Sequence, residues 1–467
     1  MKLTVLGGGG VRSPLLVSAV LRRAARLGLD ELCLMDIDAE KLQFIGAMAG
    51  YQAAQASSPL RLTTTTDPHQ ALDGATYVIT TIRAGYEQGR ILDERIALRH
   101  GVLGQETTGP GGFAMALRSI PAILDYAALL EQLSPGAWIF NFTNPSGLVT
   151  QALRDAGFSH TIGICDGANS AQNSVADWLG EDPLRLRAEV FGLNHLSWSR
   201  RVWRPGQETD LLHPLLHDPA FQAATLLHLF EPALIRQVDM YLNEYLFYYY
   251  YREEALRQVL AHDRTRGEEV AELNQALLAE LRQVDPVRFP GQALEVFYTY
   301  KDRRSATYMP YSAPGQAAPT APVKQRQERT QLQEEEGYAG VALGLIEALQ
   351  GDQPLYTALN VPNAGAIPGM QAGDVVEVSC QVDRHGVTPL PLSADTPNQG
   401  FFEPALALMR SVKLYERLTV EAIRTRSRPT AVEALMCHPL VCSYSLASAL
   451  VDEYLAAHSK YVGLWEK

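Results

Sequence analysis

The sequence is poor in cysteine and has no long basic run. Its 467 residues include only five cysteines, Cys33, Cys165, Cys380, Cys437 and Cys442. They are too few and too scattered for a disulfide framework, which indicates a reducing compartment. The formal net charge is −12, so nucleic acid is not expected as a partner, although an arginine cluster could still bind a small anion.

We also find no N-terminal signal sequence and no apolar run that we would expect to span a membrane. The chain begins MKLTVLGGGG, which leads directly into a strand and a glycine turn. Hydrophobic residues make up 46% of the chain, enough for one large or two medium domains with real cores. We therefore expect a cytoplasmic protein with no membrane partner.

What the sequence does contain is an alternation of apolar strands and amphipathic helices in its first part. Strand-like runs occupy 2–6, 31–38, 76–85, 136–147 and 160–167, with helical segments between them. This alternation predicts an α/β fold with a doubly wound, Rossmann-type parallel sheet.

The pattern changes after about residue 190. Paired strands are expected in AEVFGLNHLSWSRRVWRPG and a late hairpin in DVVEVSCQVDRHGVTPLPL, with long helices between and after them, one of them over PALIRQVDMYLNEYLFYYYYREEALRQVLA. A Pro/Ala-rich stretch, 312–325, is expected to be a loop. We predict a nucleotide-binding domain over 1–190 and a mixed, largely helical domain over 191–467 that supplies the substrate and metal site and the oligomer contacts.

A glycine turn follows the first strand and precedes the first helix. Without side chains there, a pyrophosphate can approach the backbone and the helix N-terminus, and an acid after the second strand, Asp36 or Asp38, can bind a ribose hydroxyl. A tight turn of another α/β fold is the alternative. The residues expected at the cofactor are Gly7, Gly8, Gly9, Gly10, Val11, Arg12, Asp36 and Thr81.

Polar, glycine-rich sequence fills residues 82–121, where a functional segment is expected. Arg83, Arg90 and Arg95 are candidates to hold an anion and Glu106 is a candidate acid; ordinary solvated charges are the alternative. Asn144, in NFTNPSG, follows a buried strand, where a carboxamide points into the ligand crevice of such a sheet. An Asn-Pro turn explains it equally simply.

Two isolated residues, Cys165 in TIGICDG and His195 in FGLNHLSW, are each more often core residues than ligands. Together they would form an incomplete metal site, with room left for substrate oxygens and water.

Five tyrosines crowd the segment NEYLFYYYYREE: Tyr245, Tyr248, Tyr249, Tyr250 and Tyr251. On one helix they cannot share a face, so most are expected to pack. One of them acting as a base would need a cation or metal beside it to lower its pKa.

In this order, GGGGVRSP, GQETTGPGGFAMALRSIP, NFTNPSG, GIC, FGLNHLSW, EYLFYY, TRGEEV, VVEV and HPLV resemble glycoside hydrolase family 4. The resemblance covers nearly the whole chain and implies NAD, a divalent metal such as Mn²⁺, and a fold like that of lactate and malate dehydrogenases. It also implies roles for single residues. Cys165 and His195 would bind the metal, Tyr245 would be the base, Glu106 would support that base, and Arg90, Asn144 and Arg266 would bind substrate.

The chemistry implied by the resemblance differs from hydrolysis by two carboxylates. NAD oxidises the sugar at C3, the C2 proton is removed with the help of the metal, the leaving group is eliminated, water adds, and C3 is reduced again. The implied activity is a 6-phospho-β-glucosidase acting on a small glycoside, as a homodimer or homotetramer.

Departures from the family pattern keep other activities open. Asp166, after the cysteine, resembles the α-glucosidase branch, where it would be an acid for the leaving group. The run EEEGYAG lacks an arginine that the family usually has, which leaves an unphosphorylated α-glycosidase as an alternative. Two alternatives come from other functional classes: a plain NAD-dependent dehydrogenase of hydroxy acids or sugars, and a nucleotide sensor without activity.

Overall fold

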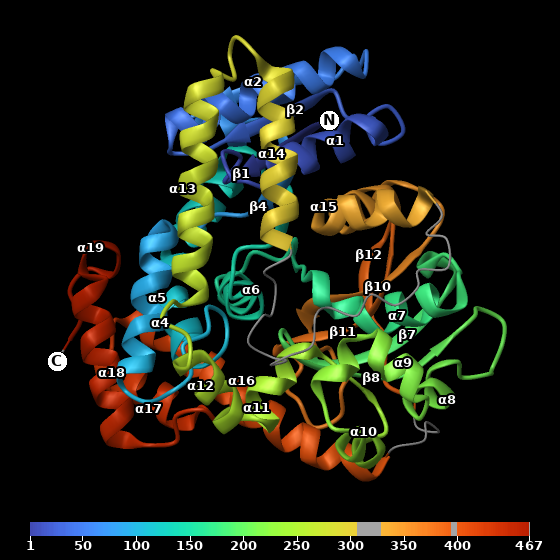
Figure 1. Ribbon diagram of the computed structural model, residues 1–467, viewed down its shortest axis with the longest axis vertical. Helices are drawn as coiled ribbons and strands as arrows, with labels where there is room; N and C mark the ends of the chain where they lie inside the picture. The colour runs from blue at the N-terminus through green and yellow to red at the C-terminus, as the bar shows by residue number, and fades with distance from the viewer. Residues whose placement is uncertain (306–327, 394–398, 467) are drawn as a thin grey trace.

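A nine-stranded sheet forms the centre of the computed structural model, which describes residues 1–305, 328–393 and 399–466 (Figure 1). The strand order is β12-β11-β10-β6-β5-β4-β1-β2-β3. The strands β3-β2-β1-β4-β5-β6 are parallel, in the order of the Rossmann fold. Their bounds are Lys2–Leu6 (β1), Glu31–Met35 (β2), Arg61–Thr65 (β3), Ala75–Thr80 (β4), Trp138–Asn141 (β5) and Thr161–Gly163 (β6). The predicted fold class is confirmed.

Helices pack on the sheet in two groups, since both faces of its apolar parallel strands must be covered. The helices α1 (Ser13–Arg23), α2 (Ala39–Gln55) and α15 (Glu328–Gln350) form one group, with α1 against both others. The other contains α3 (Pro68–Leu72), α5 (Gly109–Leu133) and α6 (Ser146–Asp155), with α5 against both others. The inner strand β2 is buried along its whole length, and β1 and β4 nearly so, whereas the edge strand β3 is partly exposed.

Three later strands extend the sheet in antiparallel pairing: β10 (Leu355–Pro362), β11 (Val375–Asp383) and β12 (Gly386–Pro389). Asn360 of β10 pairs with Gly163 of β6. The predicted late hairpin is confirmed by β11 and β12. Because these strands come from beyond residue 350, both predicted domains contribute to one sheet, and the boundary near residue 190 stays a prediction.

The predicted strand pair after residue 187 is also present. It consists of β7 (Arg187–Leu193) and β8 (Leu196–Trp203), which pair with the short β9 (Tyr241–Leu242) in a separate antiparallel sheet. The continuous helix expected over 232–261 is wrong. The chain there forms α10 (Pro232–Val238), β9, the 3₁₀ turn η4 (Glu244–Leu246), α11 (Phe247–Tyr250) and α12 (Arg252–Leu260), because Asp239 adopts a left-handed conformation that ends α10.

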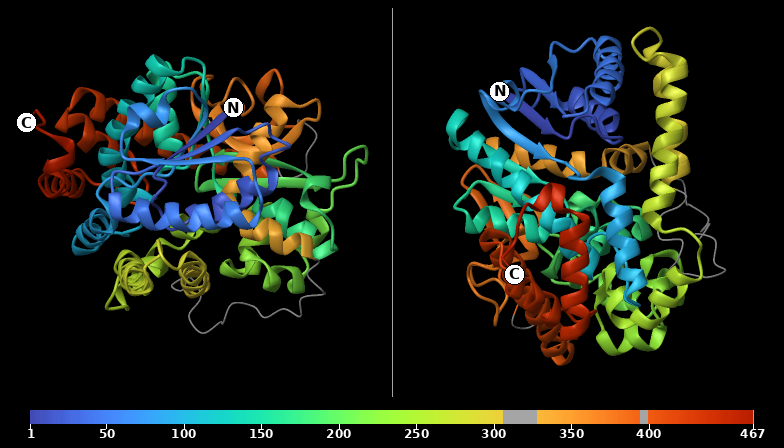
Figure 2. Two further views of the ribbon diagram at one scale, coloured as in Figure 1. Left: turned by 90° about the horizontal axis from the view of Figure 1, so that it is seen from above. Right: turned by 90° about the vertical axis from the view of Figure 1, so that its left-hand side faces the viewer.

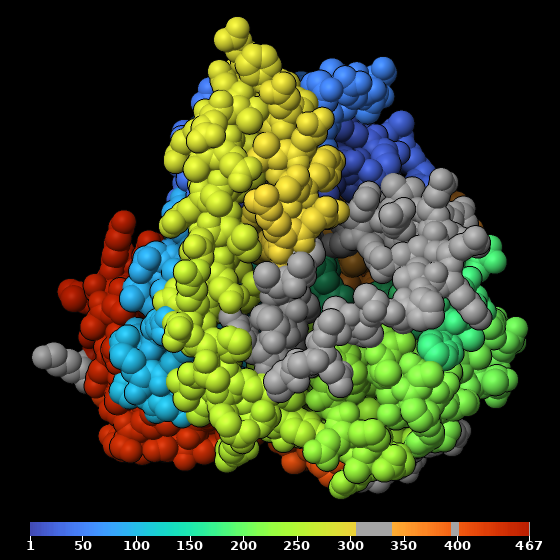
Figure 3. Space-filling view, viewed as in Figure 1, coloured from blue at the N-terminus to red at the C-terminus, as the bar shows by residue number. Residues whose placement is uncertain are grey.

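The C-terminal helices pack beside α4 (Tyr86–Arg99) and α5, far from β12 (Figures 1 and 2). They are α16 (Gln399–Thr425), α17 (Arg428–Cys437), α18 (Tyr444–Ala457) and α19 (Ser459–Val462). A pair of long helices, α13 (Arg266–Val284) and α14 (Pro290–Ser305), forms a ridge in front of the N-terminal strands (Figure 3). The remaining elements are η1 (Asp166–Asn169), α7 (Ser170–Leu179), η2 (Pro183–Arg185), α8 (Leu212–Leu216), α9 (Pro219–Ala224) and η3 (Leu226–Leu229). The Pro/Ala-rich stretch 312–325 lies outside the described residues.

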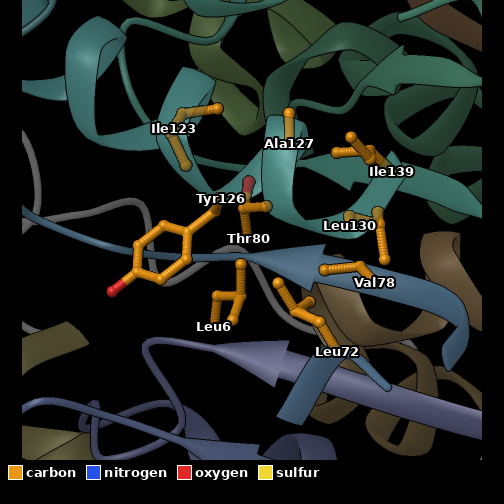
Figure 4. A pocket seen from close by; sticks show the side chains of 9 residues that line it. All are labelled: Leu6, Leu72, Val78, Thr80, Ile123, Tyr126, Ala127, Leu130 and Ile139. Carbon is orange, nitrogen blue, oxygen red and sulfur yellow. The ribbon is translucent and has the colours of Figure 1, made fainter. Parts of the chain in front are cut away.

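One helix, α5, corrects the expectation that no apolar run would be long enough to span a membrane. By length and composition it is, but 61% of its most apolar window is buried inside the fold, and core helices pass the same test. The cavity between α5 and the sheet measures about 10 Å³ and is lined by apolar side chains such as Val78, Ile123 and Leu130 (Figure 4). That is room for one water at most, so it is not a ligand site.

Candidate functional site

The glycine turn at the end of β1 is folded tightly against two neighbouring strands. Gly7 and Gly8 both donate their N–H groups to the carbonyl oxygen of Met35, at 2.9 and 2.7 Å. Gly7 has φ +92°, and a Cβ built on it would lie 2.8 Å from Oγ1 of Thr81. A Cβ on Gly8 would lie 2.8 Å from Cβ of Leu34. Only glycine therefore allows this approach of the backbone to β2 and β4.

Asp36 and Asp38 have separate tasks. Asp36 directly follows β2, and its carboxylate accepts hydrogen bonds from the N–H groups of Gly9 and Asp38, both at 3.0 Å. Burial raises the pKa of Asp36, against these two bonds. Asp38 instead caps α2 by accepting from the N–H of Lys41. Asp36 is thus the acid beside the glycine turn.

The other residues expected at a cofactor lie around the same turn. Thr81 follows β4 and donates its N–H to the carbonyl of Leu6 at 2.8 Å. Val11 is partly buried against the core, and Arg12 occupies the N-cap position of α1. A loop built from bare backbone, followed by a helix N-terminus and an acid, fits the diphosphate and ribose of a dinucleotide.

His195 lies in the tight turn between β7 and β8, with φ +62°, rather than inside a strand as its apolar surroundings suggested. Its Nδ1 is 2.8 Å from the hydroxyl of Thr107, which leaves Nε2 as the nitrogen that can coordinate a metal. Burial lowers the pKa of His195 to about 4. The imidazole is therefore neutral near pH 7, as a metal ligand must be.

Cys165 lies two residues beyond the end of β6, in the N-cap position of η1. Burial, followed by the nearby charges of Glu377 and Asp166, raises the pKa of its thiol well above the ordinary value. Without a cation this sulfur stays protonated, and a bound metal would favour the thiolate.

A buried carboxylate, Glu377 of β11, connects the surroundings of Cys165 with those of His195. It accepts hydrogen bonds from Ser197 at 2.7 Å and from Asn194 at 3.3 Å, which lie two residues after and one residue before His195. The same carboxylate acts electrostatically on Cys165. The segment that carries Tyr245 also reaches this region: the side chain of Asn243 donates a hydrogen bond to the carbonyl of Gly167, two residues beyond Cys165. The two predicted ligands therefore border one region.

The ring of Tyr245 lies on that of His195, with 3.8 Å between the ring centroids and 4° between the ring planes. The backbone N–H of Tyr245 donates a hydrogen bond to the side-chain oxygen of Asn243 at 3.0 Å. The neighbouring tyrosines differ: burial raises the pKa values of Tyr248, Tyr249 and Tyr250. Among the tyrosines of this segment, a ring contact with His195 is recorded for Tyr245 alone within the described residues.

An ion-pair network lies near Tyr245. Glu106 contacts Arg83 at 2.7 Å and Arg90 at 3.0 Å. Burial would raise the pKa of Glu106, but these two arginines hold it well below its usual range. Arg90 also contacts Glu94 at 2.7 Å, and Glu106, Glu94 and Tyr245 raise the pKa of Arg90 against the effect of its burial. Glu106 is therefore an anion here.

The other residues predicted to bind substrate lie in different places relative to this ion-pair network. Arg266 begins α13 and contacts Glu269 at 3.3 Å, while the adjacent Gly267 donates its N–H to Glu94. Asn144 lies half-buried after β5. Arg95, a third anion candidate, instead forms an ion pair with Glu268 of α13 and belongs to the helix packing.

Asp166 connects the residues after the glycine turn with those around Cys165. Its carboxylate is 3.4 Å from the guanidinium of Arg12, and both side chains are about half exposed. The cysteine, the acid beside it and the start of α1 therefore face one another across the carboxyl ends of the strands.

Sequence reasoning missed several residues at this centre: Thr107, Asn194, Asn243, Glu244 and Glu377. A signal existed for Glu377, which is an acid in the middle of the otherwise apolar run VVEV. Such a residue is rarely buried without partners.

Family models cover most of the chain. The model described as family 4 glycosyl hydrolase matches residues 2–181, and that of its C-terminal domain matches residues 190–441. The chain belongs to this family. The resemblance noted from its motifs is thereby confirmed, and the protein is a glycosyl hydrolase.

Named relatives match along their full length. A probable 6-phospho-β-glucosidase of Bacillus subtilis is 32% identical, covering 99% of this chain and 97% of the relative. The 6-phospho-β-glucosidase BglT of Thermotoga maritima is 28% identical, covering 99% of this chain and all of the relative. A structure of the Thermotoga maritima 6-phospho-β-glucosidase with manganese, NAD⁺ and glucose-6-phosphate superposes with a TM-score of 0.80 at 28% identity, covering 99% of this chain and 100% of that one.

Proposed function

We propose that this chain is a 6-phospho-β-glucosidase that uses NAD and a divalent metal, most simply Mn²⁺. Full-length relatives at 28–32% identity carry that name, and one was crystallised with manganese, NAD⁺ and glucose-6-phosphate. The observation that carries the proposal is the stacking of Tyr245 on His195, because it brings a phenol next to an imidazole that can bind a metal.

The nucleotide is assigned to the glycine turn. The backbone N–H groups and the start of α1 suit its diphosphate, and the carboxylate of Asp36 suits a ribose hydroxyl. Gly7 to Gly10, Val11, Arg12 and Thr81 are the proposed contacts. The metal is assigned to the sulfur of Cys165 and Nε2 of His195. When bound, NAD and the metal supply reversible oxidation of the sugar and stabilisation of the charge that deprotonation leaves.

The chain's own residues manage the proton. Tyr245 is the proposed base, stacked on the His195 ring and near enough to Arg90 to interact with its charge. A cation beside a phenol favours its ionised form. Glu106 fixes Arg90 at 3.0 Å, so its proposed role is to position that cation. Asn144 and Arg266 are the proposed contacts for sugar hydroxyls.

A phosphate on the sugar is supported by an excess of positive charge near Glu106. Arg304, in the last turn of α14, has its pKa lowered by burial and by the charges of Arg12 and Arg83. Like charges gathered in a buried place are relieved by an anion. Replacing Arg304 with Gln should therefore raise KM for a 6-phosphorylated glycoside and leave KM for the unphosphorylated glycoside unchanged.

The α-anomer is the second candidate because of Asp166, which lies beside Cys165 and within 3.4 Å of Arg12. It could protonate a leaving group from the other face of the sugar. Full-length relatives include a 6-phospho-α-glucosidase of Lacticaseibacillus paracasei at 28% identity. Asp166→Asn would then lower turnover of glycosides with poor leaving groups most.

A single assay tests the proposal. The four nitrophenyl glucosides, α and β, with and without a 6-phosphate, are incubated with NAD, Mn²⁺ and a thiol, and both nitrophenol and NADH are followed. Release from the phosphorylated β-glucoside without accumulation of NADH is expected. Stoichiometric NADH would instead identify a dehydrogenase, and no turnover of any substrate would indicate a nucleotide sensor.

The homodimer or homotetramer and the cytoplasmic location remain predictions. Size-exclusion chromatography with light scattering tests the first, and fractionation of the source cells tests the second.

A further inference from the structure

A cluster of two histidines and one aspartate lies outside the candidate active site, on the small antiparallel part of the fold. His213 is in α8 and His217 directly follows it, so the four-residue spacing puts both rings on one face. Asp239 comes from the residue that ends α10. Figure 1 shows α8 and α10 at the opposite end of the molecule from β1 and β2.

The ligand atoms converge as they would around one ion. Nδ1 of His213 is 3.1 Å and Nε2 of His217 is 3.3 Å from the same oxygen, Oδ1 of Asp239. All three atoms lie within 4.8 Å of one another. A tetrahedral metal with bonds of about 2.0 Å has ligand atoms roughly 3.3 Å apart. The two short separations match that edge.

Hydrogen bonding does not account for the position of Nδ1 of His213. Nδ1 of His213 is buried, and among the described residues it makes no contact with hydrogen-bond geometry. The side chains themselves are not sealed off, because His213 is 43% and His217 is 41% exposed. An ion can therefore enter from solvent, and water can complete its coordination.

We infer that His213, His217 and Asp239 form a second metal site, for a divalent transition metal of the kind that imidazole and carboxylate bind, with Zn²⁺ as the probe. It is separate from Cys165 and His195 and does not depend on the proposed activity.

The site would act on the segment that leads to Tyr245. Asp239 lies two residues before Tyr241, the first residue of β9, and Tyr245 lies in the 3₁₀ turn just after that strand. A metal bound by all three ligands ties α8 to the start of this segment. The expected role is structural, since binding to the folded state alone raises stability.

Zinc titration of the full-length Cys165→Ser variant tests the inference, because that change removes the other proposed site. One equivalent of Zn²⁺ is expected to bind by calorimetry and to raise the unfolding temperature. Adding His217→Ala should weaken this binding at least 100-fold and abolish the thermal shift. Asp239→Asn should do the same without disturbing the backbone, since asparagine tolerates the φ of +54° at this position.

His385→Ala is the matched control, because this histidine is exposed on the turn between β11 and β12, away from the cluster. It should leave the zinc affinity unchanged. If Cys165→Ser does not fold, Co²⁺ is added to the unaltered chain: absorption that His217→Ala removes while the sulfur-to-cobalt band persists supports the site. No zinc binding by Cys165→Ser, or equal binding after His217→Ala, overturns the inference.

Discussion

The proposed nucleotide end of the site is made of backbone, whereas the proposed metal end is made of side chains from separate elements. At the first, Gly7 and Gly8 bond to Met35 within one strand–turn–helix unit and its neighbouring strand. At the second, the proposed residues Cys165, His195 and Tyr245 come from the link between β6 and η1, the β7–β8 turn and η4. The shape of the glycine turn is set by its backbone, so the turn tolerates few substitutions. The arrangement at the other end is set by side chains, so it depends on residues that are distant in sequence.

The largest effect is expected at the side-chain end, from Tyr245→Phe. Loss of a general base lowers turnover by roughly 10² to 10⁴-fold. Exchange of the substrate's C2 proton with deuterated solvent, followed by NMR, should stop. Tyr251→Phe is the control, since that hydroxyl accepts a hydrogen bond from the N–H of Glu231, in a loop outside the candidate site. Persistent exchange in Tyr245→Phe would assign the base to another residue.

Cys165→Ser should come next. Loss of a direct ligand is expected to weaken activation by Mn²⁺ about 100-fold, at least as much as loss of a supporting residue. Activity is measured against Mn²⁺ concentration, with NAD held saturating. Cys442→Ser serves as the control, since this thiol is exposed and donates to the carbonyl of His438. Equal activation curves for Cys165→Ser and the unaltered enzyme would disprove the assignment.

Gly7→Ala tests the backbone end against a matched position. Gly7 and Gly157 have nearly the same φ, +92° and +95°, so alanine should cost about 1–2 kcal/mol of stability at either. Only at Gly7 does the new Cβ meet Thr81, since nothing lies within 4 Å at Gly157. NAD affinity, measured by fluorescence titration, should fall about tenfold or more in Gly7→Ala and stay unchanged in Gly157→Ala. Equal affinities would mean that the turn does not bind the nucleotide.

The smallest effect is expected at His438 and concerns the stability of the fold at acid pH. His438 is fully buried, accepts the N–H of Leu440 at 3.1 Å, and burial lowers its pKa to about 3. Below pH 6.5 His438 becomes protonated in the unfolded chain but stays neutral in the folded chain, so the free energy of unfolding falls as the pH falls. The loss is roughly 2 kcal/mol at pH 5.

His438→Asn keeps an acceptor for Leu440 and removes the titration. Its unfolding free energy in urea should therefore decline less between pH 7 and pH 5 than that of the unaltered chain. Parallel declines would show that another group controls acid unfolding.

Local patterns predicted the backbone end well and the side-chain end only in part. The apolar run KLTVL, the glycine turn and Asp36 lie close together in sequence, so their contacts follow from strand order. The strand β3 was missed because RLTTT is polar and half-exposed, with no apolar pattern. The tyrosine segment was predicted as one helix because nothing local marks Asp239 as the residue that ends α10.

The residues around the metal end could not be derived from spacing. Cys165 and His195 were singled out by resemblance, but their link through Glu377 depends on a strand more than 180 residues after His195. Thr107 likewise reaches His195 only after the polar segment has folded against the β7–β8 turn. Such long-range contacts are set by tertiary packing, and the periodicity of hydrophobic residues carries no information about them.

The pairing of Asn360 with Gly163 bears on how this protein is made. Until the ribosome has released about 200 further residues, β6 has no neighbour on its outer side, and its N–H and C=O groups are open to any other chain. The nucleotide half can assemble early, but its growing sheet stays vulnerable to aggregation until β10 arrives. Chaperone demand during synthesis should accordingly be greatest in the interval between these two strands.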